Sequence, residues 1–551
     1  MTHGFLEVEA KFAVDDTTPT PDLTALDAVA AEGEASEQHL SAIYYDTRDL
    51  RLTRAKITLR RRTGGKDDGW HIKMPASQGR LELGAEPTDP AEIPPEILSQ
   101  VRAIVRNLPL EPIAQVDNNR REVTLLNDTG APVAEFCDDR VTAWSLLPGG
   151  QKQTWREWEV ELAGEMPGTK EGTELIRNAT THLISAGARV SASPSKLVAA
   201  LGDTVESAPL PPHLAGEPLD EEDPAYAVVE AIKANRDSLI EWDPKVRRDE
   251  WDSVHQMRVA TRELRSQLET FEGVLAHDQM RHIENELKEL ARVLGVARDA
   301  EVVEERFHDL LDSDPTGLID DTARAHIHDD MRKEYEAAHA DIVRALDSDR
   351  YLALLDSIDH LIANASAVSA ESAASAVSAE SAASAAGAAA GAAAGAADPV
   401  GTAEVLYSSL AEAYKKLMKR HGRVQENYDN PELPLHEREN YVHDTRKTAK
   451  KLRYAAEAVG EASSLKTGKL AKACKTLQSQ LGDFQDAVTA RDRLHGLAQD
   501  AAERGEDTFA YGMLYQVEMT NAAAALEGYS DVIADIKRAF DRIKNKKKKK
   551  R

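Results

Sequence analysis

Acidic and basic side chains recur at alternate positions in several short segments near the N-terminus. The first segment, FLEVEAKF, places Glu7, Glu9 and Lys11 on one face if it is a β-strand, because successive strand side chains point to opposite faces. The same spacing in WREWEVEL is shared by three acids, which are Glu157, Glu159 and Glu161. If such a face is turned inward, it needs opposite charge, a metal ion or a ligand, because unmatched buried charge is costly.

Other short segments follow the same alternation with basic side chains. The segments are TLRRR, WHIKM and GRLEL, and the residues that share a face in each are Arg60 and Arg62, His71 and Lys73, and Arg80 and Glu82. On a single strand, a charged face usually lies in solvent over an apolar core. Here one strand offers only acids and another only arginines, whereas a merely soluble face mixes both signs. This separation favours a closed sheet whose charged face surrounds an internal site.

The elements that would position these residues are short strands followed by long helices. Residues 1–203 alternate β-branched and aromatic runs with turn signals, which is typical of an antiparallel barrel or sandwich with a few helices. Residues 204–223 are Pro-rich and acidic and predict a linker, and from 224 to 543 the apolar period is helical. We therefore predict an α+β protein with an antiparallel β domain and an all-α domain.

Low-complexity sequence interrupts and ends the helical part. The tract 363–398 is rich in Ala, Ser and Gly, offers few bulky side chains to bury, and predicts an insertion between a first part, 224–362, and a second part, 399–543. Residues 544–551 form a lysine-rich run, which predicts a disordered tail because like charges repel.

The N-terminal motifs resemble the CYTH branch of the triphosphate tunnel metalloenzymes over residues 1–203. The resemblance rests on ExExK at 7–11, YYDT at 44–47, RxR at 60–62, Lys73, ExExE at 157–161 and Lys196 in SPSKL. It implies a closed eight-stranded antiparallel barrel with flanking helices, whose tunnel binds a triphosphate together with Mg²⁺ or Mn²⁺. Both are hard cations that prefer carboxylate and water oxygens.

The resemblance also assigns roles to single residues. The predicted metal ligands are Glu7, Glu9, Glu157, Glu159 and Glu161. The predicted substrate-binding residues are Lys11, Arg60, Arg62, Lys73, Arg120 and Lys196, which suit a polyanion because Arg binds phosphate bidentately and Lys acts as a point charge. The predicted catalytic residues are Glu7, Glu9, Lys11 and Lys73.

Two features depart from the family pattern or leave a choice open. Relatives often carry another base ahead of the residue that matches Arg120, and here Asn118 and Asn119 occupy that stretch. Loss of a phosphate contact would lower affinity or change substrate preference more readily than it would abolish metal binding. Asp139 is a candidate additional tunnel acid, and Asp138 competes with it for that role.

The helical part repeats itself. The segment HQMRVATRELRS from His255 matches HDTRKTAKKLRY from His443, and LGVARDA from Leu294 matches LGDFQDA from Leu481. Each copy carries a stripe of bases at positions i, i+3, i+7 and i+10, which share one helix face. The two stripes are His255, Arg258, Arg262 and Arg265 in the first copy, and His443, Arg446, Lys450 and Arg453 in the second.

A basic stripe on one helix is usually a solvated face, but here it occurs twice in a chain of net charge −27. The repeats resemble the two halves of a CHAD domain over residues 224–543. That resemblance implies a pair of four-helix bundles related by the internal repeat, with the basic helices lining a groove that binds inorganic polyphosphate. The stripes lack the interleaved aromatic residues that single-stranded nucleic acid needs for stacking.

The totals of the chain limit the remaining classes. The excess of acids over bases, 95 to 68, argues against indiscriminate nucleic-acid binding, and two cysteines fit a reducing compartment. A signal-peptide pattern, a run of 18 strongly apolar residues and a GxxxxGK phosphate-binding loop are all missing from the sequence. We therefore predict a cytoplasmic protein without a membrane partner or a P-loop site.

Both constellations point to phosphate chains, so we predict a metal-dependent triphosphatase that hydrolyses inorganic triphosphate or a related triphosphate and binds polyphosphate through its helical part. The alternatives are a non-catalytic polyphosphate-binding adaptor, a thiamine triphosphatase and an adenylyl cyclase. The acidic clusters favour the enzyme, and Asn118 with Asn119 favours the adaptor.

Overall fold

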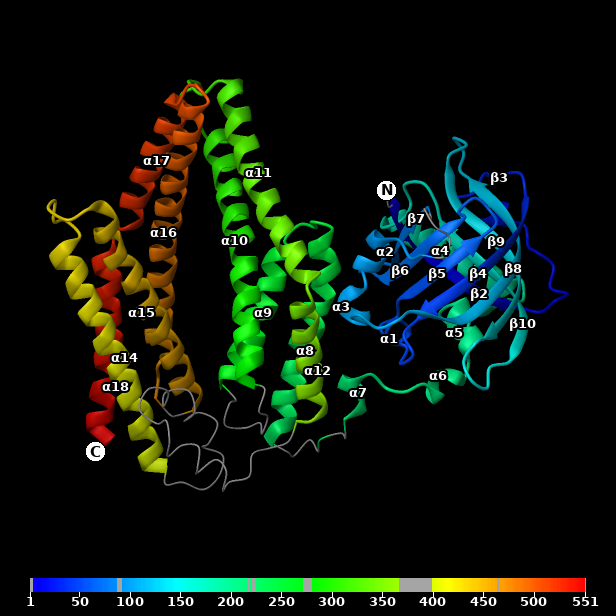
Figure 1. Ribbon diagram of the computed structural model, residues 1–551, viewed down its shortest axis with the longest axis horizontal. Helices are drawn as coiled ribbons and strands as arrows, with labels where there is room; N and C mark the ends of the chain where they lie inside the picture. Colours follow the sequence, from blue (N-terminus) through cyan, green and yellow to red (C-terminus); the bar gives the residue numbers. More distant parts are fainter. Residues whose placement is uncertain are drawn as a thin grey trace. The chain divides into compact units, whose positions relative to one another are not determined.

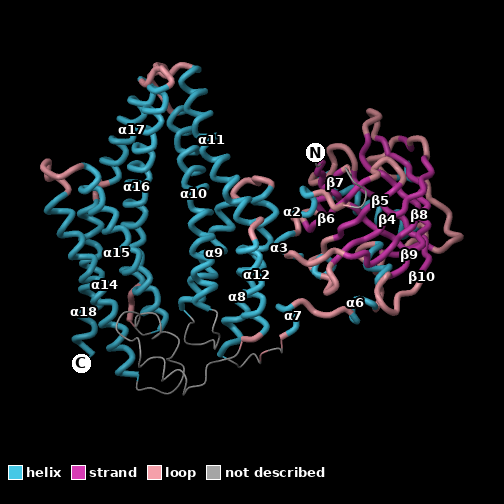
Figure 2. The backbone as a smooth tube through the Cα atoms, viewed as in Figure 1, coloured by secondary structure: helices cyan, strands magenta, loops and turns pink. Residues whose placement is uncertain are grey.

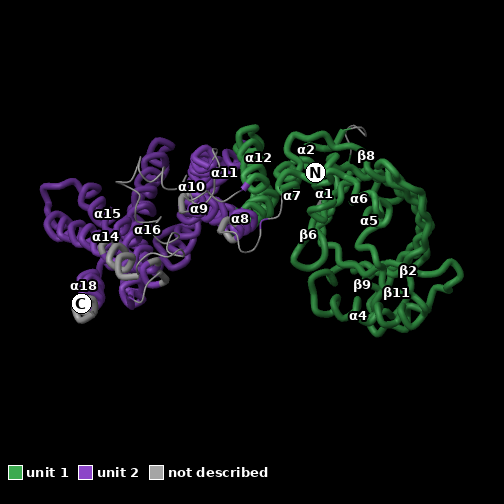
Figure 3. Tube along the Cα trace, turned by 90° about the horizontal axis from the view of Figure 1, so that it is seen from below, with its two compact units in different colours: residues 1–218, 236–253, 345–364 green, residues 219–235, 254–344, 365–551 purple. Residues whose placement is uncertain are grey.

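The computed structural model describes residues 3–86, 92–216, 219, 224–270, 280–365, 399–462 and 465–550. Strands occupy the N-terminal part of the chain and helices the C-terminal part, as Figure 2 shows by colour. The predicted two-domain α+β class is confirmed. The chain forms two compact units (Figure 3), of which one comprises residues 1–218, 236–253 and 345–364 and the other residues 219–235, 254–344 and 365–551.

The N-terminal part is built on a single antiparallel sheet. Its strands are β1 (His3–Glu7), β2 (Glu9–Val14), β3 (Ala31–Glu32), β4 (Ser36–Asp46), β5 (Thr58–Thr63), β6 (Gly69–Pro75), β7 (Arg80–Ala85), β8 (Glu111–Leu126), β9 (Pro132–Ser145), β10 (Lys152–Leu162) and β11 (Arg189–Val190). The strands run in the order β1-β7-β6-β5-β4-β8-β9-β10-β2-β11, and β3 pairs with β8.

The sheet curls round because both ends of this order meet in the N-terminal segment. β1 pairs with β7 and β2 pairs with β10, while β1 and β2 are separated in the chain by Val8 alone. If β1 and β2 count as one strand and the two-residue strands β3 and β11 are set aside, eight strands surround the interior. Figure 1 shows these strands arranged around a common axis.

The apolar face of the curled sheet points outward and is covered. Trp158 and Val160 of β10 are fully buried, and they pack in one cluster with Phe12, Leu175 and Leu183. Leu175 and Leu183 belong to α4 (Lys170–Ser185), which begins where the hydroxyl of Thr169 accepts a hydrogen bond from the backbone N–H of Gly172. With its apolar residues packed under helices, each strand presents its alternate, charged residues to the interior.

Short helices complete the N-terminal part. They are η1 (Leu23–Ala25), α1 (Arg51–Arg54), α2 (Pro95–Ser99), α3 (Arg102–Val105), α5 (Lys196–Leu201), α6 (Thr204–Ser207) and α7 (Pro212–Ala215). α5 begins at Lys196 because the hydroxyl of Ser195 accepts from the backbone N–H of Val198 at 3.2 Å. Leu197 and Leu201 of α5 pack beneath one end of the sheet with Tyr44.

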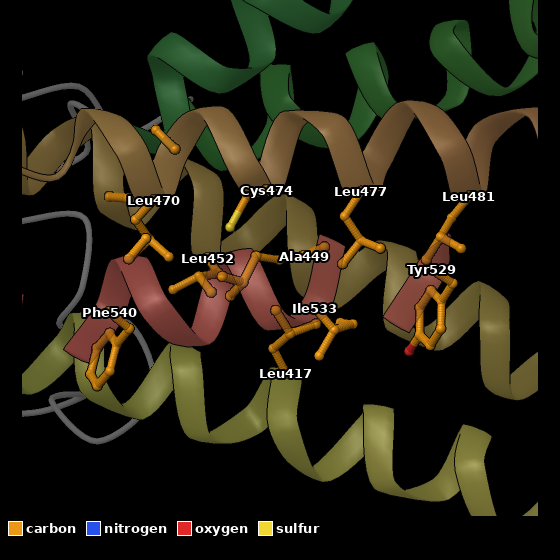
Figure 4. Close-up of a cluster of buried hydrophobic side chains, with 14 of the residues drawn as sticks. Leu417, Ala449, Leu452, Leu470, Cys474, Leu477, Leu481, Tyr529, Ile533 and Phe540 are labelled. Atoms are coloured by element: carbon orange, nitrogen blue, oxygen red, sulfur yellow. The ribbon is translucent and has the colours of Figure 1, made fainter. Parts of the chain in front are cut away.

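The remaining helices form the C-terminal part. They are α8 (Pro224–Arg247), α9 (Ser253–Thr270), α10 (Met280–Asp312), α11 (Asp321–Leu346), α12 (Asp349–Ala363), α14 (Pro399–Asn427), α15 (Leu435–Ala462), α16 (Gly468–Glu503), α17 (Phe509–Ala525) and α18 (Tyr529–Lys550). α14, α15, α16 and α18 enclose one apolar core, shown in Figure 4, in which Leu417, Leu452, Leu477 and Ile533 are fully buried. These helices form a four-helix bundle.

The two repeats are joined by a shared core and by reciprocal ion pairs. Phe307 of α10 is buried in one cluster with Leu494 of α16, and the ends of α10, α11, α16 and α17 lie together in Figure 1. Two ion pairs cross between the repeats in opposite senses, Arg306 with Glu518 and Arg493 with Glu334. In each pair the arginine lies in the longest helix of one repeat, α10 or α16. The acid lies in the helix that follows the longest one in the other repeat, α17 or α11.

A buried ion cluster lies within the first unit. Asp359 of α12 is 1% exposed and accepts hydrogen bonds from Arg106 at 3.0 Å and from Arg236 of α8 at 2.7 Å. The second guanidinium also donates to Nδ1 of His213 at 3.2 Å, and Arg106 pairs in addition with Asp356. The cluster joins Arg106, which follows α3, and His213 of α7 to helices α8 and α12.

The Ala/Ser/Gly tract and the lysine-rich tail can be compared with the expectations for them. Most of the predicted insertion, residues 366–398, lies outside the described residues. The lysine-rich tail was expected to be disordered. That expectation is wrong for residues 544–550, because α18 continues to Lys550. Among the helices of the described ranges, none combines the length and the apolar character that a bilayer crossing requires.

Candidate functional site

The curled sheet encloses a tunnel of about 810 Å³ lined mainly by charged side chains. Glu7, Glu9 and Lys11 all border it, as their alternation predicted. The other predicted residues that border it are Arg60, Arg62, Lys73, Arg120, Glu159, Glu161 and Lys196. Glu157 is buried but is not among the residues that border the cavity.

The tunnel has a covered end and an open end. At the covered end, Ser195 and Lys196 border the cavity and α5 packs beneath it. At the other end, Lys66, Asp67 and Asp68 border the cavity with side chains that are 70%, 65% and 51% exposed. The cavity therefore opens to solvent between these residues, with the buried charges behind them.

Three carboxylates form a group that suits a divalent cation. One oxygen from each of Glu7, Glu9 and Glu161 lies within 4.8 Å of the other two. Glu7 is 2% exposed and pairs through Oε1 with Lys73, while its buried Oε2 has no hydrogen-bond partner among the described residues. Three carboxylates, one of which has a buried oxygen without a hydrogen-bond partner among the described residues, fit a hard cation such as Mg²⁺ or Mn²⁺.

Charge in this carboxylate group is incompletely matched by bases. Burial raises the pKa of Glu161 to about 8, with Glu7 and Glu9 adding to the rise and Lys73 opposing it. Without a further cation, the carboxylates of this group repel one another in a site shielded from water. A divalent cation would supply the missing positive charge.

A second carboxylate group lies in the wall of the tunnel and is matched by bases. Its members are Asp139, Glu157 and Glu159, and the surrounding bases are Lys11, Arg120 and Lys196. Arg120 binds both carboxylate oxygens of Asp139, at 2.8 and 2.7 Å, and Lys196 lies 2.6 Å from Glu157. Although burial alone would raise the pKa of Glu159, the adjacent bases hold it well below its usual range. Three bases face three acids, although Lys11 also pairs with Glu9, so this group is better compensated than the first. The predicted role of Glu157 and Glu159 as metal ligands stays a prediction.

The choice between Asp138 and Asp139 follows from strand register. Asp139 lies opposite Glu157 and is fully buried among the tunnel bases. Asp138, one residue earlier, points to the other face of β9 and accepts two hydrogen bonds from Arg156, at 2.8 and 2.7 Å. Asp139 is therefore the acid of the tunnel wall.

Glu82 also lies in the site, although the family motifs did not assign it a role. The carboxylate is 4% exposed and lies 3.3 Å from Arg60, 2.9 Å from His71 and 2.9 Å from Lys73. Burial opposes ionisation of Glu82, but Lys73, His71 and Arg60 together hold its pKa well below its usual range. The signal in the sequence was the alternation of GRLEL, which places Arg80 and Glu82 on one face.

Arg60 and Arg62 lie beside each other at the open half of the tunnel. Burial, aided by repulsion from Arg60, lowers the pKa of Arg62 to about 10, against the attraction of Asp67 and Glu82. Arg62 pairs with Asp67 at 2.6 Å. Asn118 of β8 also borders the cavity, is 6% exposed, and has a buried Oδ1 without a partner among the described residues.

The YYDT motif has a local structural role. Asp46 is fully buried and its carboxylate accepts from the backbone N–H groups of Leu52 at 2.9 Å and Thr53 at 2.8 Å. It therefore ties the end of β4 to the start of α1. Tyr44, two residues earlier, borders the cavity, and its hydroxyl accepts a hydrogen bond from the guanidinium of Arg60.

The basic stripes of the helical part meet the second repeated motif. Arg258 of α9 lies against Gly295 of α10, whose Cβ position would be 3.9 Å from Nε. In the second copy, Arg446 of α15 lies against Gly482 of α16, with 3.5 Å to Nη2. Each stripe arginine thus lies across the glycine of the LG segment in the next helix, within van der Waals distance of its Cβ position.

The stripes are unequally exposed. Arg262 is exposed, whereas the histidines and the arginines next to them are half-buried. Burial lowers the pKa of His443, which is hydrogen-bonded to Gln485. Burial raises the pKa of Asp486, with Arg446 and Arg306 opposing the rise and Asp299 of the first copy adding to it. The acids of the two LG segments therefore lie near one another, close to the second stripe.

Comparison with known proteins identifies both parts of the chain. The CYTH domain matches residues 6–186 and the CHAD domain matches residues 230–495. Two uncharacterized proteins from two strains of Mycobacterium tuberculosis are 35% identical over 552 residues, which cover 98% of this chain and 98% of each relative.

Two solved structures share lower similarity with the chain. PptA from Streptomyces chartreusis is 17% identical, covers 57% of this chain and 98% of its own, and has a TM-score of 0.37. The CHAD domain from the plant Ricinus communis is 23% identical, covers 59% of this chain and 93% of its own, and has a TM-score of 0.32. On the domain matches and the full-length relatives, the chain belongs to the family in which a CYTH domain is followed by a CHAD domain.

Proposed function

We propose that the tunnel hydrolyses inorganic triphosphate in a metal-dependent reaction. The observation that carries the proposal is the pairing of an under-compensated carboxylate group, Glu7, Glu9 and Glu161, with a set of bases in the same cavity. Such a site binds a polyanion through its bases and a divalent cation through its acids. Covalent catalysis by the protein is not required, because phosphoryl transfer depends mainly on positioning and charge stabilisation.

Roles follow from where each side chain lies. The tunnel bases hold the phosphate oxygens, with Arg60 and Arg120 offering planar guanidinium groups and Lys11, Lys73 and Lys196 compact ammonium groups. Their carboxylate partners fix each base in place before the ligand enters, so little reorganisation is needed. When bound at Glu7, Glu9 and Glu161, the cation would neutralise charge on phosphate oxygens and polarise a water molecule.

The experiment is phosphate release from inorganic triphosphate with Mg²⁺ or Mn²⁺ and then with chelator. We expect metal-dependent release in the wild type and a loss on the order of 100-fold in Glu161→Gln, as for removal of one charge-stabilising group. Glu165→Gln is the matched control, because Glu165 is an exposed acid just beyond the same strand. A titration with Mn²⁺ should show weaker metal binding in Glu161→Gln than in the wild type, and unchanged metal binding in Glu165→Gln.

The same assay separates the enzyme from its main alternative. Triphosphate binding without release of phosphate would make the chain a non-catalytic binding protein, which the uncharged Asn118 in the tunnel wall favours. Thiamine triphosphate and a nucleoside triphosphate serve as comparison substrates, because the bases of the tunnel contact phosphate and not the group attached to it.

For the helical part, we propose binding of inorganic polyphosphate along the two basic stripes. Support comes from the repetition of one arrangement, in which Arg258 and Arg446 each lie across a glycine of the following helix. Several bases along a groove suit a polymer with one charge per phosphate, because each contact releases counterions.

A further inference from the structure

One base of the tunnel comes from a turn and not from a strand. Lys66 lies between β5 and β6, in a turn where Gly64 and Gly65 have φ values of +83° and +77°. Backbone of this kind favours glycine. Lys66 borders the cavity at its open end, and its Nζ lies 3.0 Å from Oε1 of Glu122 on β8. The turn thus reaches from the end of β5 to β8, which lies two places from β5 in the sheet.

Lys66 is held far less firmly than the other lysines of the tunnel. The side chains of Lys11, Lys73 and Lys196 are 16%, 15% and 11% exposed, whereas that of Lys66 is 70% exposed. The side chain of its partner Glu122 is 11% exposed, so this pair is open to water on the lysine side alone, whereas the pairs of the other three lysines are largely buried on both sides and are expensive to break. Lys66 is therefore the tunnel lysine that can leave its carboxylate for a phosphate at the lowest cost.

Glu122 does not lose its only partner when Lys66 leaves. Its second oxygen, Oε2, accepts a hydrogen bond from Nε2 of Gln38 at 3.2 Å. Glu122 is also 9% exposed, so water reaches little of it and the remaining hydrogen bond matters. The ion pair between Lys66 and Glu122 can open while the carboxylate stays hydrogen-bonded.

The open end needs a base of this kind. Glu122, Glu135, Asp67 and Asp68 border the cavity there. Asp67 and Asp68 are paired with Arg62 and Arg61, so Glu122 and Glu135 are the carboxylates that would repel an entering polyanion if Lys66 were removed. Asn118 adds no charge from β8, and Arg62 is already paired with Asp67 at 2.6 Å. The outermost phosphate of a bound chain would otherwise meet mainly acids.

We propose that Lys66 leaves Glu122 and binds the outermost phosphate of a triphosphate chain held in the tunnel. The inference rests on the proposed triphosphate ligand, but it concerns binding and not turnover. Lys66 is thereby a substrate-binding residue carried on a turn, beside the bases fixed in the strands.

The test is calorimetric titration of the full chain with inorganic triphosphate in the presence of chelator, so that metal-dependent hydrolysis cannot occur. We expect Lys66→Ala to weaken binding on the order of 10-fold, as for loss of one charge-assisted hydrogen bond, and Lys66→Arg to retain affinity. Lys152→Ala is the matched control, because Lys152 is an exposed lysine that begins β10 and does not border the cavity.

A second variant separates direct binding from simple neutralisation of Glu122. If Lys66 acts only by cancelling that carboxylate, its removal has no effect in a Glu122→Gln background. We expect the loss of affinity from Lys66→Ala to persist in that background. Unchanged affinity there, or in the single variant, overturns the proposal.

The outcomes also distinguish this inference from the proposed function. Wild-type binding without hydrolysis in the metal assay, together with weaker binding by Lys66→Ala, refutes the enzyme and supports the role of Lys66. Hydrolysis by the wild type with equal binding by Lys66→Ala refutes the role of Lys66 alone. A wild type that neither binds triphosphate in chelator nor releases phosphate with metal refutes both.

Discussion

Two glutamates of the tunnel, Glu159 and Glu161, differ in pKa because different side chains surround them. Glu159 touches Lys11, Arg120 and Lys196, and its pKa is held low, whereas burial among other acids raises the pKa of Glu161 to about 8. The two residues are two positions apart in one strand. Their difference marks where a cation is still needed and where the protein has already supplied one.

A half-buried histidine, His213, provides a prediction about pH and stability. Burial next to Arg236 lowers the pKa of His213 from 6.5 to about 4, against the attraction of Asp359 and Asp237. The unfolded chain therefore takes up a proton first as the pH falls. The contribution of His213 to the free energy of unfolding is full above pH 6.5 and is lost as the pH falls to 4. Because water partly screens this half-buried ring, the contribution amounts to at most about 2 kcal/mol.

Denaturant unfolding of wild type and His213→Gln at pH about 7 and about 4.5 checks this expectation. The variant should lose less stability than the wild type between the two pH values. His308→Gln serves as control, because His308 is 67% exposed. An equal loss in the wild type and in His213→Gln would contradict the assignment.

Residue types and alternation predicted most of the tunnel but not its pairings. The parity of FLEVEAKF and WREWEVEL placed the acids and Lys11 on inward faces, because that depends only on strand geometry. The selection of Asp139 over Asp138 depends on the register between β9 and β10. Lys66 lies in a turn, where alternation carries no information.

At the scale of elements, the helical part places equivalent residues of its two repeats in equivalent surroundings. The bases of α9 and α15 cross the glycines of α10 and α16. Periodicity predicted the stripes and the repeat, but it could not show that the LG motif packs against them, because that contact joins different helices.

The paired stripes give a prediction for polyphosphate binding. We expect Arg258→Ala combined with Arg446→Ala to weaken binding and to reduce the salt slope by about two, because two phosphate contacts are lost. The measurement is a titration with inorganic polyphosphate at several salt concentrations. Lys333→Ala combined with Lys416→Ala removes the same charge from exposed positions and should leave both quantities nearly unchanged.

Retention of both the affinity and the salt slope in the arginine variant would exclude the stripes as the binding surface. A similar loss in the lysine variant would instead show that binding follows total charge and not these positions.

At the scale of the whole molecule, the join between the repeats predicts unequal effects of two equivalent arginines. Glu518 is fully buried and accepts two hydrogen bonds of 2.7 Å from Arg306, whereas Glu334, the partner of Arg493, is 36% exposed. Removal of Arg306 leaves a buried acid unpaired, so Arg306→Ala should lower the free energy of unfolding by about 3 kcal/mol. Arg493→Ala should lower it by less than about 1 kcal/mol.

Chemical denaturation of the full chain measures both effects, and Glu518→Gln combined with Arg306→Ala should recover part of the loss. Equal effects of the two arginine variants would show that burial of the acid does not decide the strength of the join.

The reciprocal pairs, Arg306 with Glu518 and Arg493 with Glu334, have the pattern of an interface between two identical subunits. In a twofold dimer, each contact occurs twice with the partners exchanged, and here the exchange occurs inside one chain. The two repeats of this chain therefore meet much as two subunits of a dimer do, with equivalent arginines reaching acids of the opposite repeat. An isolated repeat would therefore expose the apolar surface around Phe307 or Leu494 and associate with a second copy of itself.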